Sequence, residues 1–254
     1  MSSIPPIANI GLAVDTLGRH SAVNGRLTRS ELLDIIRSEN YRLKRNVDKV
    51  LETCRLESGQ VVLDQEPIDL HKLLGEVVKG LDPAISVSLA MVHWDLGSAH
   101  PLVQGDRTYL SNVFFGLLDN ALKYSPSGAR ITIGTHDEGS KVVVEVSDNG
   151  PGIRKEDLLL VFEKFFRANV SDLHDVKGTG LGLYLAKRIV EAHNGNIAAY
   201  NNVDGGATIR IQLERYGASG RGRREGIDRG GRSEHGAAAR REPALGGLPH
   251  ATGR

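Results

Sequence analysis

The stretch Asn112-Val-Phe-Phe-Gly-Leu-Leu-Asp-Asn-Ala-Leu-Lys-Tyr-Ser-Pro126 carries two patterns at helical spacing. The first is an apolar stripe, which predicts a core-facing helix from a cap at Asp106 to about Tyr124. Its members are Leu110, Val113, Phe114, Leu117 and Ala121. The second is a polar edge formed by Asn112, Gly116, Asn120 and Lys123. An amide oxygen can ligate Mg²⁺ and an ammonium can hold phosphate, so this edge is a candidate site, with a solvated helix edge as the alternative.

The composition is that of an ordinary globular protein. The 254 residues accommodate one or two domains, and 40% are hydrophobic and 25% charged. The net charge of +1 gives no reason to expect nucleic acid as a partner. No apolar run reaches the roughly 18 residues of a membrane span, and the N-terminus lacks a signal-peptide pattern, so we expect a cytoplasmic location. The one cysteine excludes an internal disulfide framework.

Residues 1–60 are expected to form a helical hairpin. A short helix after Pro6 carries a seam of Ile7, Ile10, Val14 and Leu17, and a polar loop covers residues 18–29. A second helix, capped by Ser30, is expected to run to about Glu57 with a seam of Leu32, Ile36, Leu43, Val47, Val50 and Cys54. Two helices with narrow seams bury little alone, so we expect dimerisation through the hairpin. A helical extension packed on its own domain is the alternative.

Residues 61–214 mix strands with helices. Strands are expected at 61–63, 85–94, 102–104, 131–133, 142–146, 196–200 and 207–213, with a turn at 136–140. Besides the helix of the opening stretch, one helix is expected after a cap at Asp69. Another is expected over about 181–192, ended by Asn194-Gly195.

Residues 215–254 are expected to be disordered. From Gly217 onward Gly, Arg and Ala dominate, and Lys, Val, Phe, Tyr and Trp are missing, so little apolar surface can be buried. An RNA-binding arginine-glycine arm is the alternative, although such arms usually interleave aromatic residues for stacking. A frame-shifted read-through of the gene is another explanation for this composition.

Three further motifs follow the opening helix. Asp148-Asn-Gly-Pro-Gly152 comes directly after a predicted strand; it is a simple turn or a place where the Asp148 carboxylate accepts a hydrogen bond from a purine amino group. Phe162-Glu-Lys-Phe-Phe-Arg167 is a core plug or the anchor of a lid-like loop. Gly178-Thr-Gly-Leu-Gly182 opens a helix, where backbone N–H groups can face phosphate oxygens, and it lacks the Lys-Ser/Thr of a Walker motif.

Together and in this order, the four features resemble the ATP-binding domain of sensor histidine kinases, within the GHKL superfamily. The resemblance covers roughly residues 30–214. It implies an α+β fold, a two-layer α/β sandwich of the Bergerat type, preceded by the dimerisation hairpin. Asn120, Lys123 and Tyr124 fall on the N box of the family, and the G1 box, F box and G2 box follow at the three motifs above.

The resemblance also implies roles for these residues. Asn120 would ligate Mg²⁺, Lys123 would contact phosphate, and Arg167 would approach the γ-phosphate; these three are the candidate catalytic residues. The ATP-binding residues implied are Asn120, Lys123, Tyr124, Asp148, Gly150, Gly152, Phe162, Phe165, Lys177, Gly178, Thr179, Gly180, Leu181 and Gly182. The cofactors implied are ATP and Mg²⁺, and the partners are a second kinase chain and a response regulator receiver domain.

The chain departs from the family at two places. Gly116 stands where many members have a second Asn, one turn before the Mg²⁺ ligand. When Pro6 is aligned with the Pro of the acceptor motif His-Glu-x-x-Thr-Pro, Met1 aligns with the His, Ser2 with the acidic residue and Pro5 with the Thr. We therefore expect a histidine kinase core truncated before its phospho-acceptor His. A nucleotide-binding dimerisation module without catalysis, a gene fragment and a GHKL serine kinase or ATPase are the alternatives.

Overall fold

The computed structural model describes residues 6–18, 28–59, 61–167 and 179–217. Several sequence predictions lie outside these ranges: those for Met1, Ser2 and Pro5, for most of the hairpin loop, for Lys177 and Gly178, and for the tail from residue 218.

The N-terminal hairpin consists of α1 (Pro6–Gly18) and α2 (Arg29–Glu57). The prediction that Ser30 caps α2 is wrong, because the cap is Thr28. Glu31 lies three residues after Thr28 and completes a capping box, in which the Thr28 hydroxyl accepts from the Glu31 N–H and the Glu31 carboxylate accepts from the Thr28 N–H. The two helices pack against each other, and Asn9 donates a hydrogen bond to Glu39 at 3.1 Å.

The predicted seam of α2 is only partly covered within one chain. Leu32 is buried, whereas Val47 and Val50 are 49% and 43% exposed, and Cys54 is exposed as well. The hairpin therefore leaves the second half of this seam without a packing partner in the described part of the chain.

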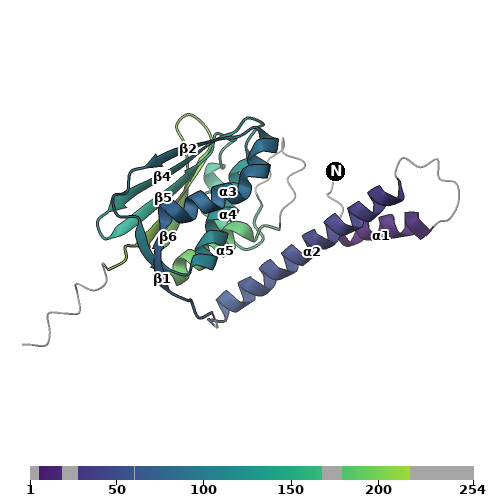
Figure 1. The fold of residues 1–254 in the computed structure, drawn as a ribbon, viewed down its shortest axis with the longest axis horizontal. Helices are drawn as coiled ribbons and strands as arrows, with labels where there is room; N and C mark the ends of the chain where they lie inside the picture. Colours follow the sequence, from purple (N-terminus) through teal and green to yellow (C-terminus); the bar gives the residue numbers. More distant parts are fainter. Residues whose placement is uncertain (1–5, 19–27, 60, 168–178, 218–254) are drawn as a thin grey trace, which may run out of the picture. The chain divides into compact units, whose positions relative to one another are not determined.

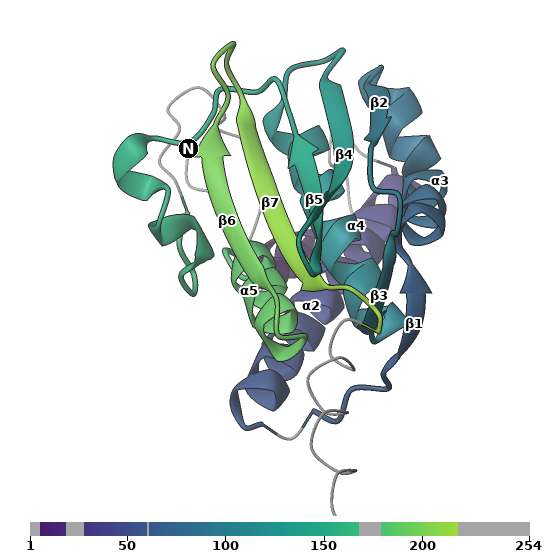
Figure 2. The ribbon, with the colours of Figure 1, turned by 90° about the vertical axis from the view of Figure 1, so that its left-hand side faces the viewer.

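The remaining described residues form the predicted two-layer α+β sandwich (Figures 1 and 2). Five strands pair in the order β2 (Met91–Leu96), β4 (Arg130–Glu138), β5 (Lys141–Ser147), β7 (Ala207–Glu214) and β6 (Asn196–Asn201). β2 and β4 are parallel, and the other neighbours are antiparallel. A two-stranded ribbon of β1 (Glu66–Asp69) and β3 (Leu102–Gly105) lies beside the sheet.

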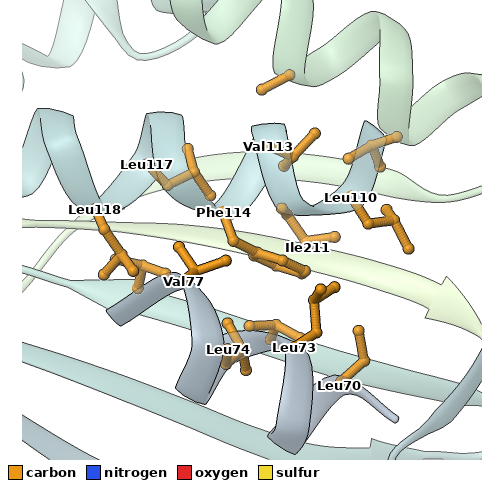
Figure 3. Packing of buried hydrophobic residues seen from close by; sticks show 14 of the residues in the cluster. Leu70, Leu73, Leu74, Val77, Leu110, Val113, Phe114, Leu117, Leu118 and Ile211 are labelled. Carbon is orange, nitrogen blue, oxygen red and sulfur yellow. The ribbon is translucent and has the colours of Figure 1, made fainter. Parts of the chain in front are cut away.

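Three helices cover one face of the sheet: α3 (Leu70–Ser88), α4 (Arg107–Tyr124) and α5 (Gly182–Ala192) (Figure 2). α4 contacts both of the others and carries the apolar stripe of the opening stretch, all of it buried as predicted. Phe114 is fully buried and points from α4 toward Leu73, Leu74 and Val77 of α3, with Ile211 of the sheet close by (Figure 3). The core thus fixes α4, and with it the polar edge on the same helix.

The strand predicted at 85–94 begins too early. α3 continues to Ser88 although it contains Pro83, because Ile85 still packs on the core, and Leu89 then ends the helix in the left-handed conformation at φ 55°. The strand predicted at 61–63 is also wrong, since the strand β1 comes later, at Glu66–Asp69. Asp69 caps α3 as predicted and accepts hydrogen bonds from the His71 and Lys72 N–H groups.

Other boundaries shift by a few residues. β4 extends to Glu138, so the predicted turn at 136–140 is reduced to Gly139 and Ser140. Two short 3₁₀ turns, η1 (Lys155–Asp157) and η2 (Leu160–Phe162), lead into the aromatic motif, and η2 ends at Phe162, the first residue of that motif. After β7, Arg215 forms an isolated antiparallel β-bridge with Val103, and the Tyr216 N–H donates a hydrogen bond to the Leu102 carbonyl oxygen at 2.8 Å. Ordered backbone therefore continues two residues beyond the predicted boundary at 214.

A buried histidine ties the start of α4 to the end of α5. The Asp106 side chain caps α4 through the Thr108 and Tyr109 N–H groups. The Asp106 N–H in turn donates to His193 Nε2 at 2.9 Å, and His193 Nδ1 lies 2.7 Å from the Ile189 carbonyl oxygen. Burial lowers the pKa of His193, which matches a neutral ring that accepts at one nitrogen and donates at the other.

Candidate functional site

A cavity of about 760 Å³ opens beside the C-terminal half of α4. This volume lies within the range of roughly 300–1,000 Å³ usual for small-molecule sites. The polar edge of α4, the turn after β5, the aromatic motif and the start of α5 all contribute to its wall. The predicted site residues that line it are Asn120, Lys123, Tyr124, Asp148, Gly152, Arg167, Thr179, Gly180 and Gly182.

Four predicted residues are placed elsewhere. Phe162 is buried and supports the wall from behind, while Phe165 is 62% exposed; neither side chain lines the cavity, and Phe166 does so instead. Gly150 and Leu181 also stay outside the lining, although Leu181 is buried beneath it.

Asp148 is held in place by the turn that follows β5. Its Oδ1 accepts from the Gly150 N–H at 2.8 Å and from the Ala207 N–H at 3.3 Å. Its Oδ2 makes no hydrogen bond within the described residues, so one acceptor oxygen of this cavity-lining side chain is available to a ligand. Burial raises the pKa of Asp148, and the two backbone hydrogen bonds oppose that rise.

Gly206 in the neighbouring loop packs against the backbone of Asp148, a contact that the sequence analysis did not predict. Its φ is +88°, and a Cβ on it would lie 1.9 Å from the Asp148 carbonyl oxygen. Asn202 adds a hydrogen bond from its amide to the same carbonyl oxygen at 2.9 Å. The loop between β6 and β7 thus fixes the backbone from which the Asp148 carboxylate projects.

The C-terminal half of the predicted polar edge of α4, Asn120 and Lys123, lines the cavity, whereas Asn112 and Gly116 lie outside the lining. Asn120 is half-buried, and its side-chain amide makes no hydrogen bond among the residues that the structure describes. Lys123 pairs with Asp119 one turn earlier. Gly182 approaches this edge, since a Cβ on it would lie 4.0 Å from Asn120 Nδ2. An uncommitted amide and an ammonium therefore lie together on one wall.

The aromatic motif and the glycine motif meet directly. The Phe165 N–H donates to the Gly180 carbonyl oxygen at 3.1 Å. Gly180 has φ +70°, and a Cβ there would lie 2.6 Å from the Phe165 carbonyl carbon, so only glycine permits this approach. Arg167 and Thr179, which flank these two segments, both line the cavity.

Cationic side chains dominate the charge of the lining. They are Arg42, Arg45, Lys49, Lys123, Arg154 and Arg167, against the two carboxylates Asp119 and Asp148. A polyphosphate carries the opposite charge, and Asp148 adds an acceptor suited to an amino group. The cavity therefore fits a nucleotide in volume, charge and hydrogen-bonding groups.

Comparisons with known proteins point to the same ligand class. Residues 105–217 match the family described as "Histidine kinase-, DNA gyrase B-, and HSP90-like ATPase". Sensor protein RprX of Bacteroides fragilis is 31% identical over 210 residues, which cover 82% of this chain and 40% of RprX. The chain thus spans less than half of that relative.

Two solved structures share the fold. Histidine kinase AdeS of Acinetobacter baumannii superposes with a TM-score of 0.67 at 23% identity, covering 83% of this chain and 95% of that chain. Histidine kinase ThkA in complex with response regulator protein TrrA gives a TM-score of 0.65 at 24% identity, covering 83% of this chain and 57% of that chain.

Residues 105–217 therefore form an ATPase domain of the histidine kinase, DNA gyrase B and HSP90 family. The histidine kinase ATPase domain that the order of the four motifs predicted is thereby confirmed for this part of the chain. None of the helices in the described ranges is long and apolar enough to cross a membrane.

Proposed function

We propose that this chain is the ATP-binding core of a histidine protein kinase in a two-component signalling system. The observation that carries the proposal is the cavity, in which the uncommitted Oδ2 of Asp148 and a set of cations occur together. Asp148 accepts a hydrogen bond from the adenine amino group, Tyr124 lines the base pocket, and Lys123 and Arg167 bind phosphate.

Phosphoryl transfer depends on positioning and on neutralising the charge of the moving group. An imidazole nitrogen of the acceptor forms a bond to the γ-phosphorus, the bond from that phosphorus to the β–γ bridging oxygen breaks, and ADP leaves. Lys123 and Arg167 offset the charge on the phosphate oxygens. Asn120 would hold Mg²⁺, whose charge would offset part of the negative charge on the phosphate oxygens.

The Asp148→Asn variant is expected to bind Mg-ATP about 10- to 100-fold more weakly than the wild type. Asn Oδ1 can keep the two backbone hydrogen bonds, but Nδ2 then presents a donor to the adenine amino group. Affinity is measured by isothermal titration calorimetry, with Asp95→Asn on the exposed strand β2 as the matched control. Equal ATP affinity of Asp148→Asn and Asp95→Asn would show that the base does not bind at Asp148.

The acceptor His is proposed to come from a partner chain. The motif alignment places Met1 at the acceptor position, and a thioether cannot take up a phosphoryl group as an imidazole does. The exposed half of the α2 seam, with Val47, Val50 and Cys54, supports a dimer with a second copy or with an intact kinase. A response regulator receiver domain is the proposed downstream partner, as in the complex of ThkA with TrrA. We also propose a cytoplasmic location.

Incubated alone with Mg-ATP, the chain is expected to carry no acid-labile histidine phosphate. Mixed with a longer kinase that has the acceptor His but a mutated N-box Asn, it is expected to label that partner. The assay uses radiolabelled ATP with acid and alkali stability of the label as the readout, and analytical ultracentrifugation confirms the heterodimer. Label on this chain alone would place the acceptor elsewhere in its sequence. An unlabelled partner in a proven, ATP-loaded heterodimer would favour a nucleotide-binding dimerisation module.

A further inference from the structure

One face of α2 forms part of the cavity wall, although α2 lies outside the four sequence motifs. Four residues on this face, Arg42, Arg45, Asn46 and Lys49, follow the i, i+3, i+4, i+7 spacing of a helix face, and Tyr41 of α2 lines the cavity as well. The exposed seam residues Val47 and Val50 lie on another face of the same helix. α2 can therefore pair with a partner through its seam and still contribute to the cavity.

The C-terminal end of α2 is anchored on the ATPase domain, which holds this face in place. Leu56 is part of the main hydrophobic core, and Thr53 is 2% exposed. Glu57 Oε2 accepts a hydrogen bond from Lys164 Nζ at 2.9 Å, and Glu57 Oε1 accepts one from the Tyr184 hydroxyl. Lys164 belongs to the aromatic motif and Tyr184 to α5, so the anchor reaches both segments that close the cavity.

Lys49 is the cation on this face with the strongest need for a counter-ion. Its side chain is half-buried, and its ammonium makes no ion pair or hydrogen bond within the described ranges. Burial lowers its pKa, and Arg45 and Lys123 lower it further, whereas Asp119 and Glu52 oppose the shift. A cation held between other cations at a cavity is stabilised when an anion enters.

Resting on the proposed function, we propose that Lys49 of α2, with Arg45 beside it, binds the phosphates of the nucleotide. Bound ATP then links the helical hairpin to the ATPase domain, because Lys49 approaches from one side and Lys123 from the other. Nucleotide affinity therefore depends on a residue that lies about 70 positions before the N box.

The test is calorimetric titration of the full chain with Mg-ATP and, separately, with adenosine. Lys49→Gln is compared with Lys44→Gln, which removes the same charge from an exposed position of α2 outside the cavity. Lys49→Gln is expected to weaken ATP binding about tenfold and leave adenosine binding unchanged, because adenosine has no phosphate. Arg45→Gln is expected to give a smaller loss, since Arg45 is more exposed.

Lys49→Gln is expected to fold, because the fold disfavours the charge that the substitution removes. If Lys49→Gln binds ATP as tightly as the wild type and Lys44→Gln do, Lys49 does not bind phosphate. The proposed function would remain intact in that case. An equal loss of ATP and adenosine affinity would mean that Lys49 acts on the fold of the site and not on phosphate. A wild-type chain that binds no ATP would overturn the proposed function, and this inference with it.

Discussion

Gly206→Ala is expected to abolish measurable ATP binding and to lower the free energy of unfolding by more than about 3 kcal/mol. Gly206 has φ +88°, and the added Cβ would lie 1.9 Å from the Asp148 carbonyl oxygen. Backbone atoms on both sides would have to move, which breaks the 2.9 Å hydrogen bond from the Asp148 N–H to the Ala207 carbonyl oxygen. The Asp148 carboxylate would then lose the position in the cavity from which we propose that it accepts the adenine amino group.

Gly205→Ala is the matched control for this variant. Gly205 also has a positive φ, +92°, but a Cβ there meets no atom within 4 Å. Only the conformational penalty remains, about 1–2 kcal/mol, and ATP affinity is expected to stay near that of the wild type. Urea denaturation and calorimetric titration measure both quantities. If the two variants lose the same stability and affinity, the close approach of Gly206 to Asp148 has no special role.

Phe114→Ala is expected to destabilise the domain by about 3–5 kcal/mol. Phe114 is fully buried between α4, α3 and the sheet, and its removal leaves a cavity that these elements cannot close without moving (Figure 3). A loss of this size is a large fraction of the total stability of a typical domain, so the melting temperature should fall steeply.

The adjacent Phe115 provides the control, because its side chain is 37% exposed on the same helix. Phe115→Ala is expected to cost about 1 kcal/mol or less, with little change in the melting temperature. Comparable losses for the two variants in urea denaturation would contradict the assignment of Phe114 to the core.

The sequence was most informative where local chemistry and packing agree. Asp106 supplies a cap, and the stripe around Phe114 supplies a buried face, so α4 was predicted with correct ends. Ile85 and Val87 read as the start of a strand, but Ile85 packs on the core from within α3 and tertiary contact outweighed the β-branched signal. At the start of α2, the predicted cap was Ser30, but Thr28 is the cap because Glu31, three residues later, forms reciprocal hydrogen bonds with it.

For the site, residues within one motif could be predicted and residues far apart could not. Asn120, Lys123 and Asp148 were found because their spacing or their turn carries a chemical reason. Gly206 and Lys49 were missed because their roles depend on contacts across the fold, Gly206 with the turn after β5 and Lys49 with α4. A positive-φ glycine is visible in the sequence only as a turn former, and a helix-surface lysine only as a solvated charge.

The buried carboxylate of Asp148, which is proposed to bind adenine, lowers the stability of the ligand-free domain at neutral pH. Because its folded pKa is raised, the group adds stability when it is protonated, below the ordinary value of 3.8, and that stability is lost as pH rises through the raised pKa. At neutral pH the domain therefore retains a carboxylate that its own interior disfavours. A ligand that binds the folded state compensates by mass action, with about 2.7 kcal/mol at a hundredfold excess over Kd. Substitutions that remove the buried charge of Asp148 would raise the melting temperature of the protein and abolish its selectivity for adenine over other bases.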